Sequence, residues 1–232
     1  MSALSNKQQE IRRAIQASKA PGVVRAVVDR RLTYLTWPRL HSLQRACRDV
    51  AEVPGDVVEC GVGLGGSGVV LASLTGRPYH GYDVFGMVPP PGSCDSFDAH
   101  ARYQELATGH GRGPGGERYF GYRRDLAAVV SSTFTSFGLR DAQLHQGRFA
   151  DTLHPQAPVA LAHVDCEWHD AVAICLQRLE PWLAPGAVVV VDDYFAFAGV
   201  RAATDAFTAA HPEFELLRAP EHLVLRRALQ PL

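Results

Sequence analysis

Acidic side chains follow two continuous apolar segments of the sequence, at positions where they could share a cation. Asp165 follows the segment 159–164, and the pair Asp192 and Asp193 follows 187–191. If both segments are parallel strands, these carboxylates reach one edge of a sheet, where they repel each other unless a cation lies between them. Carboxylate oxygens are ligands that Mg²⁺ prefers. The alternative is that Asp192 or Asp193 caps the following helix and Asp165 is an ordinary strand-end acid.

A cation at such a site would allow a specific reaction. A divalent ion can chelate vicinal hydroxyls of a substrate and lower the pKa of one of them, so that a nearby carboxylate can take its proton. Glu167 and His169 follow Asp165 closely, and His169 could contact the acceptor or the metal, since imidazole suits both roles. His169 is therefore a candidate catalytic residue. His163, inside an apolar segment, is interpreted as a buried core histidine with a partner.

A glycine-rich turn follows the predicted strand 57–60. Gly61, Gly63 and Gly66 fit the pattern GxGxxG, in which glycines let the backbone approach a ligand and turn into a helix whose first N–H groups are free. The next strand ends at Asp83, about 20 residues on, where an acidic residue can accept hydrogen bonds from ribose hydroxyls. Together they predict a nucleoside-containing cofactor. The glycines alone could simply connect a strand to a helix.

The residue before the first glycine bears on which cofactor this is. The GxGxxG pattern and Asp83 do not separate a nicotinamide dinucleotide from S-adenosylmethionine. Glu59 would place a carboxylate beside the pyrophosphate of a dinucleotide, which is unfavourable. The same carboxylate suits a cofactor that carries an amino group and a sulfonium charge. Glu59 therefore favours S-adenosylmethionine.

The elements that must position these residues alternate between strands and helices. Predicted strands are 57–60, 79–82, 142–145, 159–164 and 187–191, with a terminal pair at 214–217 and 222–225. Predicted helices are 5–19, 39–50, 67–74, 98–107, 126–137, 170–183 and 200–210, with a turn at Pro185-Gly186. Such alternation, with continuously apolar strands, is typical of an α/β fold with a doubly wound, mostly parallel sheet covered on both faces. Ligands bind at the carboxyl ends of such strands.

The chain divides into two regions. Residues 1–52 form a predicted N-terminal helical segment, and residues 53–232 form the cofactor-binding domain. Within that domain, residues 86–124 are rich in proline and glycine, and a loop of this length is typical of a lid or a binding loop. This insert carries side chains suited to stacking on an acceptor or hydrogen bonding it: Tyr103, Arg112, Arg118, Tyr119 and Tyr122. The tyrosines could instead only pin the loop down.

Composition excludes several classes of protein. The chain has 232 residues, 47% hydrophobic and 20% charged, which suits one domain or one domain with an appendage. The formal net charge of −1 gives no field that favours nucleic acid or an anionic membrane. No apolar run reaches the roughly 20 residues of a membrane helix. We therefore expect a small-molecule partner, and neither nucleic acid nor membrane.

Cysteine usage bears on the compartment and on metal sites. The five cysteines include no CxxC pair, and no Cys/His spacing resembles a zinc site. An odd number of cysteines and a polar N-terminus without a signal-like apolar region indicate reduced thiols in the cytoplasm. Cys60 and Cys166 are interpreted as small buried apolar residues. We also expect a homo-oligomer, a dimer or higher, formed through exposed helices.

Several segments, in order, resemble one enzyme family. They are RLTYLT (31–36) with Arg39-Leu40, PGDVVECGV (54–62), GYDVFG (81–86), GRFADTL (147–153), VDCE (164–167), LEP (179–181) and the segment from Pro185-Gly186 to Asp192-Asp193-Tyr194. On these segments the chain resembles the macrocin and mycinamicin O-methyltransferases, a metal-dependent family that methylates deoxysugar hydroxyls of natural products. The resemblance spans about residues 32–207, most of the chain.

The resemblance implies a Rossmann-like class I methyltransferase fold that uses S-adenosylmethionine and Mg²⁺ in antibiotic biosynthesis. It places Asp83 on the ribose of the cofactor and the segment 34–36 over the cofactor. The full implied set of cofactor contacts is Tyr34, Leu35, Thr36, Glu59, Gly61, Gly63, Ser67, Asp83, Gly147, Arg148 and Phe149. Asp165, Asp192 and Asp193 would hold the cation, with Asp165 as general base. A hydroxyl then attacks the sulfonium methyl in line.

Some positions differ from the family, and other functions stay open. Gly63-Leu64 stands where relatives carry Trp-Arg, His169 where Tyr is usual, and Glu167 where Asp is common. The last two changes touch the acceptor side, and the insert is particular to this subgroup of the family. The acceptor could therefore be another diol, such as a catechol-like compound. An NAD-dependent oxidoreductase, or a partner protein that binds the adenosyl cofactor without catalysis, are the remaining alternatives.

Overall fold

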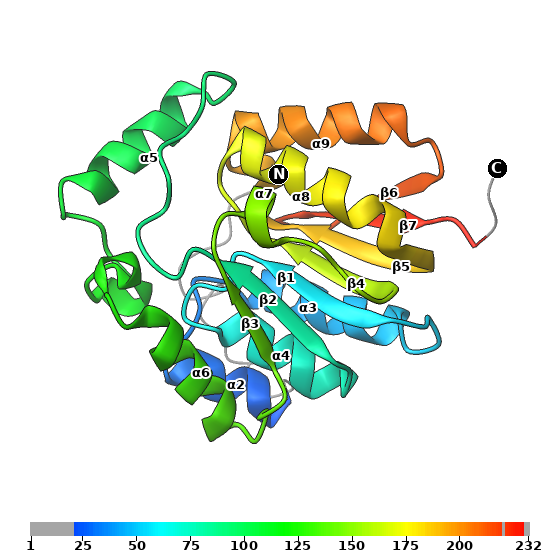
Figure 1. Cartoon of the computed structure of the whole chain (residues 1–232), viewed down its shortest axis with the longest axis horizontal. Helices are drawn as coiled ribbons and strands as arrows, with labels where there is room; N and C mark the ends of the chain where they lie inside the picture. The colour runs from blue at the N-terminus through cyan, green and yellow to red at the C-terminus, as the bar shows by residue number, and fades with distance from the viewer. Residues whose placement is uncertain (1–20, 220, 230–232) are drawn as a thin grey trace, which may run out of the picture.

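The computed structural model describes residues 21–219 and 221–229, and these form one sheet with helices on both faces (Figure 1). The helix predicted at 5–19 lies outside the described residues. Seven strands make up the sheet: β1 (Asp56–Cys60), β2 (Tyr79–Asp83), β3 (Gln143–Gln146), β4 (Val159–Val164), β5 (Leu183–Val191), β6 (Phe214–Arg218) and β7 (Leu223–Arg227). Among the described residues, no helix combines the length and the apolar character required to cross a membrane.

The sheet has the predicted doubly wound topology. Its strand order is β3-β2-β1-β4-β5-β7-β6, and the first five strands are parallel. Strand β7 pairs antiparallel with both β5 and β6, so the predicted terminal strand pair is confirmed as a hairpin. The chain leaves β1 in one direction and returns beside it as β4. The carboxyl ends of β1 and β4 therefore flank the switch point, where such sheets bind ligands.

Helices cover the sheet in two groups (Figure 1). One face is covered by α2 (Gly22–Asp29), α3 (Trp37–Asp49), α4 (Gly66–Thr75) and α6 (Leu126–Ser136). The other face carries α7 (Phe149–Thr152), α8 (His169–Leu179) and α9 (Ala198–Ala210). Helix α5 (Phe97–Ala107) projects beyond the edge of the sheet. Short 3₁₀ turns are η1 (Pro114–Gly116), η2 (Phe120–Tyr122), η3 (Glu180–Trp182) and η4 (Asp192–Phe195).

The central strands are buried on both faces, which explains their continuous apolar sequence. In β5, Val188 and Val190 pack in the cluster formed with α3 and α4, whereas Val189 and Val191 pack in the cluster formed with α8 and α9. Each of these valines is fully buried. A strand with two core-facing sides cannot alternate apolar and polar residues, so the pattern that predicted a parallel sheet has this direct physical cause.

Helix α2 was not assigned from the sequence. Its residues GVVRAVVD are rich in valine, whose branched side chain lowers helix propensity and favours strands. Val24 and Val27 are fully buried and lie in the same core cluster as α4. Burial of this apolar stripe stabilises the helix, because tertiary packing contributes more to a short helix than propensity does.

The boundary between α8 and β5 also differs from the prediction. The predicted helix 170–183 ends at Leu179, and Glu180–Trp182 form a 3₁₀ turn around Pro181, which has no N–H to continue the helix. Strand β5 begins at Leu183, so Pro185-Gly186 lies inside the strand rather than in a separate turn. The register between β4 and β5 shifts at this point, which marks a bulge that accommodates the proline.

Arg77 fixes the turn that leads into β1. Its guanidinium donates hydrogen bonds to the carbonyl oxygens of Val50, Ala51, Val53 and Gly55. We expect Arg77→Ala to lower the free energy of unfolding by about 2 kcal/mol, because several carbonyls lose a charged donor at once. Urea unfolding followed by circular dichroism measures this.

The matched control is Arg226→Ala. Arg226 pairs with Asp49 at 3.1 Å, and both side chains are more than one third exposed, at 38% and 37%. An exposed ion pair of this kind contributes less than about 1 kcal/mol. Equal losses in the two variants would show that the four-carbonyl contact of Arg77 has no special role.

Candidate active site

A cavity of about 350 Å³ opens at the carboxyl ends of β1, β2 and β4, at the predicted edge of the sheet. Its walls come from the turns after these strands, the segment before α3, the insert, and the first turns of α7 and α8. Predicted site residues that line it are Tyr34, Gly61, Gly63, Ser67, Asp83, Arg148, Phe149 and Asp165. The structure therefore brings together the glycine turn, the acid after β2 and one acid after β4.

The glycine turn approaches the neighbouring strand closely. Gly61 has a φ of +91°, and a Cβ built on it would lie 1.9 Å from the carbonyl oxygen of Asp165. The backbone N–H of Asp165 donates to Cys60 O at 2.8 Å, so the two strand ends are joined. Only glycine fits such a contact. Gly61 thus sets the distance between the glycine turn and Asp165.

Asp83 anchors the turn from the other side. Its Oδ2 accepts hydrogen bonds from the backbone N–H groups of Val62 at 2.8 Å and Gly63 at 3.0 Å, and its Oδ1 accepts one from Phe85 at 2.8 Å. Burial raises the pKa of Asp83, and these three N–H donors partly offset that effect. The carboxylate is held in one orientation at the cavity wall, with lone pairs left to accept further hydrogen bonds.

The three predicted carboxylates form one cluster. Oxygens of Asp165, Asp192 and Asp193 lie within 4.8 Å of one another. Burial, and then the charge of Asp192, raise the pKa of Asp165 well above its usual value and that of Asp193 to about 6. These are the effects of like charges confined in a small volume. Of the three, only Asp165 also lines the cavity.

A hard cation fits this donor set. The side-chain ligands are all carboxylate oxygens, as Mg²⁺ prefers, and mutual repulsion of the carboxylates is relieved by a positive charge. Arg39 of α3 already supplies one positive charge, since its guanidinium pairs with Asp192 and lies 3.3 Å from Asp193. Its Nε also lies 3.6 Å from Glu221. The guanidinium thus compensates part of the negative charge of the cluster, and the pKa values of Asp165 and Asp193 remain raised.

Glu59 lies behind the cavity rather than in its wall. It is fully buried, accepts a hydrogen bond from the Tyr79 hydroxyl, and contacts His163 Nδ1 at 2.8 Å. Although burial alone lowers the pKa of His163, hydrogen bonds to Asp192 and Glu59 raise it well above its usual value. His163 is therefore a buried histidine with partners, as predicted, and it links Glu59 to the carboxylate cluster.

Other predicted site residues also lie off the cavity. Leu35 is in the core, and Thr36 caps α3 by accepting a hydrogen bond from Arg39 N at 3.5 Å. Gly147 forms the turn after β3 with a φ of +150°. His169 begins α8, and its Nδ1 contacts Asp170 at 2.7 Å. None of the four is among the described residues that line the cavity. Their predicted contacts with cofactor, acceptor or metal stay predictions.

Several cavity residues were not assigned a role from the sequence. Arg102 of α5 and Phe120 of η2 line the wall, beside Glu167, which was expected on the acceptor side. Burial, followed by the charge of Asp193, raises the pKa of Glu167 to about 7, and Arg102 partly offsets this. Arg39 was likewise missed as a partner of the carboxylates. No local pattern reveals these roles, because each depends on residues distant in the sequence.

The insert closes over the cavity along a seam with the segment before α3. The Tyr34 hydroxyl donates to Arg112 O at 2.6 Å, the Tyr34 and Phe120 ring centroids lie 5.7 Å apart, and Arg31 pairs with Glu117 at 2.9 Å. This set of contacts is called the seam below. It joins residues before α3 to residues after α5, and so places a cover over the cavity.

The insert side chains singled out from the sequence have different roles. Only Tyr119 of that set lines the cavity. Tyr122 pins the loop down, since its hydroxyl donates to Leu106 O at 2.5 Å and accepts from Gly111 N at 3.0 Å. The guanidinium of Arg118 lies 5.2 Å from the Tyr122 ring centroid. The alternative that tyrosines stabilise the loop is therefore confirmed for Tyr122.

Comparison with known proteins shows which family has a similar sequence. The family model Macrocin-O-methyltransferase (TylF) matches residues 5–216. A similar curated protein is 8-demethyl-8-(2,3-dimethoxy-alpha-L-rhamnosyl)-tetracenomycin-C 4'-O-methyltransferase of Streptomyces olivaceus, 31% identical over 189 residues, with 72% of this chain and 67% of the relative covered. Mycinamicin III 3''-O-methyltransferase of Micromonospora griseorubida is 30% identical over 180 residues, covering 70% of this chain and 65% of the relative.

Among solved structures, the O-methyltransferase NovP is similar, with a TM-score of 0.69 at 23% identity. The alignment covers 85% of this chain and 82% of that chain. At this identity the likeness concerns the fold. It confirms the prediction of a class I methyltransferase architecture with a Rossmann-like, mostly parallel sheet.

The contact between Gly61 and Asp165 can be tested by stability. We expect Gly61→Ala to cost at least about 3 kcal/mol, because the added methyl group would overlap a backbone carbonyl and force the ends of β1 and β4 apart. Gly138→Ala is the control, since Gly138 has a φ of +80° but no atom within 4 Å of an added Cβ. Its expected cost is about 1 kcal/mol, from left-handed backbone strain alone. Similar losses in chemical denaturation would contradict the close-contact argument.

Proposed function

Since the chain belongs to the macrocin O-methyltransferase family, we propose that it transfers a methyl group from S-adenosylmethionine, with Mg²⁺, to a deoxysugar hydroxyl of a glycosylated natural product. The observation that carries the proposal is the position of Asp165. It belongs to the cluster of three carboxylates and also lines the cavity beside the glycine turn. Asp165 would therefore lie between a cation bound at the carboxylate cluster and a cofactor bound beside the glycine turn.

The cofactor would lie along the glycine turn. The backbone at Gly61 and Gly63 leaves room for close approach, and Ser67, in the first turn of α4, lines the cavity beside them. Asp83 is oriented to accept ribose hydroxyls. Tyr34, Arg148 and Phe149 line the surrounding wall. When bound, S-adenosylmethionine supplies an activated methyl group on a sulfonium, so the protein's contribution is position and exclusion of water.

Asp165, Asp192 and Asp193 would hold the cation. A bound Mg²⁺ would lower the pKa of a coordinated hydroxyl. We assign the general base to a carboxylate oxygen of Asp165, because it is the member of the cluster that lines the cavity. His163 and Arg39 keep the remaining carboxylates in place from behind. His169 receives no step in this proposal, since it does not line the cavity.

The acceptor would occupy the part of the cavity walled by the insert. Arg102, Tyr119, Glu167 and Trp168 offer donors, acceptors and aromatic faces there. One curated relative is named as a 4'-O-methyltransferase of a rhamnosyl-tetracenomycin and the other as a mycinamicin III 3''-O-methyltransferase, and the first name supports a glycosylated acceptor for this chain. The family assignment leaves an NAD-dependent oxidoreductase without support.

Replacement of Asp165 tests the assignment of the base. We expect Asp165→Ala to lower methyl transfer at least about a hundredfold, the usual contribution of a positioned base, and to change the affinity for S-adenosylhomocysteine less than about threefold. Asp141→Ala, at an exposed position before β3, should behave as wild type. Normal turnover by Asp165→Ala would refute the roles of this residue as base and as metal ligand.

Calorimetric titration tests the cofactor separately. We expect S-adenosylhomocysteine to bind and NAD⁺ not to bind. Removal of divalent ions with EDTA should abolish turnover and leave this binding nearly unchanged, because the carboxylate cluster is distinct from the glycine turn. Cofactor binding with no turnover on any glycoside, with or without Mg²⁺, would favour a protein that binds the cofactor without catalysis.

A further inference from the structure

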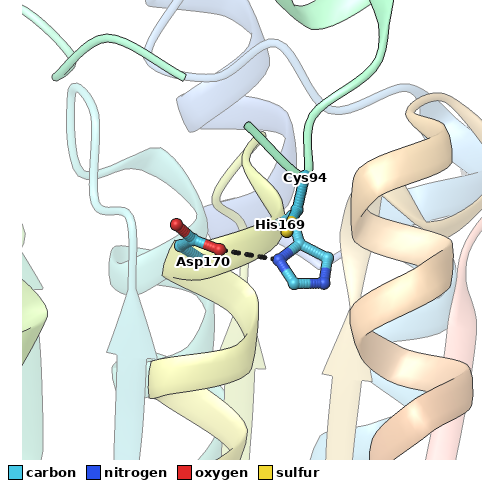
Figure 2. Close-up of side chains that lie close together, drawn as sticks. All are labelled: Cys94, His169 and Asp170. Carbon is cyan, nitrogen blue, oxygen red and sulfur yellow. Dashed lines mark hydrogen bonds and ion pairs between the residues drawn. The ribbon is translucent and has the colours of Figure 1, made fainter. Parts of the chain in front are cut away.

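A second cluster of possible metal ligands lies outside the carboxylate cluster, where the insert meets α8 (Figure 2). It consists of Cys94 from the insert and His169 and Asp170, the first two residues of α8. One ligand atom of each residue lies within 4.8 Å of the others. This cluster was not predicted from the sequence, because the cysteine and the histidine are far apart in the chain and no local Cys/His spacing joins them.

The two elements are fastened together on both sides of the cluster. Asp95 is buried, and its Oδ1 accepts a hydrogen bond from the backbone N–H of His169 at 2.7 Å, while its Oδ2 accepts one from Gly92 N at 2.9 Å. Trp168 Nε1 donates to Pro89 O at 2.8 Å. Residues on either side of Cys94 and His169 are thus fixed relative to each other. The cluster does not depend on a chance approach of a mobile loop.

Close packing at two glycines supports this arrangement. A Cβ built on Gly199 of α9 would lie 2.5 Å from Asp95 Oδ1, and one built on Gly92 would lie 2.8 Å from Asp170 Oδ2. At Gly199 the contact is with the buried, hydrogen-bonded Asp95, so glycine is required there for the insert to reach the start of α8, whereas at Gly92 the exposed Asp170 side chain can move aside. Packing between the insert, the start of α8 and α9 therefore holds Cys94 close to His169 and Asp170.

We propose that Cys94, His169 and Asp170 form a binding site for Zn²⁺ or a similar borderline-soft divalent ion, which ties the insert to α8. Thiolate, imidazole and carboxylate are the three side-chain ligands that Zn²⁺ takes in proteins, and three of them leave a fourth position for water. The thiol of Cys94 releases its proton when the metal–sulfur bond forms. The carboxylate cluster, by contrast, offers only hard oxygen ligands, so the two sites select different metals.

The exposure of the ligands allows the site to close around an ion. Ligand atoms around a tetrahedral Zn²⁺ lie roughly 3.3–3.8 Å apart, so the side chains must draw together by small rotations. The Asp170 side chain is 62% exposed and that of His169 is 23% exposed, with Nδ1 of His169 already 2.7 Å from Asp170 Oδ1. Cys94 is exposed as well. An ion from solvent can reach all three.

The ion would affect the adjoining cavity. Pro89, Trp168 and Asp170 belong both to this junction and to the cavity wall. A metal that bridges Cys94 to α8 would hold the start of the insert against the sheet and leave α5 and the later turns to move. Metal binding by these three residues involves no methyl transfer, so its test needs neither cofactor nor acceptor.

Titration of the metal-free protein with Co²⁺ tests the proposal, because a cobalt–thiolate bond gives an intense charge-transfer absorption that oxygen ligands do not give. We expect wild type to show this band, Zn²⁺ to abolish it by displacement, and excess Mg²⁺ to leave it unchanged. Cys94→Ser should lose the band. His169→Gln and Asp170→Asn should each weaken Co²⁺ binding about tenfold or more.

Two control variants locate the signal. Cys47→Ala removes a buried thiol far from the junction, and Asp192→Asn disables the carboxylate cluster; both should retain the band. Circular dichroism of each variant verifies folding. Absence of the band in wild type, or its persistence in Cys94→Ser, would overturn the proposal. A band that needs Cys94 but is unaffected by His169→Gln would indicate a surface thiol that binds metal alone, and would overturn it equally.

Discussion

The buried imidazole of His163 organises the centre of this protein. His163 is fully enclosed in β4, with Glu59 of β1 on one side and Asp192 after β5 on the other. An isolated ionised group in such a position would cost several kcal/mol, but this imidazole lies between two acidic residues and contacts Glu59 through Nδ1 at 2.8 Å. The pairing fixes three adjacent strands at their carboxyl ends. The positions of the cavity and of the carboxylate cluster depend on how these strand ends are held together.

Asp192 and Asp193 also contact residues from α3 and from the C-terminal hairpin, which lie far from β4 and β5 in the sequence. Arg39 brings α3 to Asp192 and Asp193, and His222 of the C-terminal hairpin lies 3.4 Å from Asp192. Together with His163 these groups keep the pKa of Asp192 below its usual value, although burial opposes this. The segment before β1 and the strands added after β5 therefore help to determine the charge of the site.

The sequence predicted the site residues that lie at the ends of strands. It did not predict the contacts between segments that are distant in the chain. The positions of Gly61, Asp83 and the three aspartates followed from strand ends, since the carboxyl ends of parallel strands share one edge. Helix α2 was missed because its valines favour strands in isolation, and the start of β5 at Leu183 was missed because a bulge lets Pro185 lie inside the strand. Neither the contact of Arg39 with the carboxylates nor the approach of Cys94 to His169 leaves any local pattern.

The seam over the cavity has a consequence for ligand exchange. It consists of one hydrogen bond, one ring contact and one exposed ion pair, whose Arg31 and Glu117 side chains are 59% and 64% exposed. Such interactions contribute together about 2 kcal/mol. At a free energy of that size the seam on its own would be broken about 3% of the time at equilibrium. The hydrogen bonds of Asp95 and Trp168 hold the start of the insert independently, so loss of the seam would expose the cavity along one edge without detaching the whole insert.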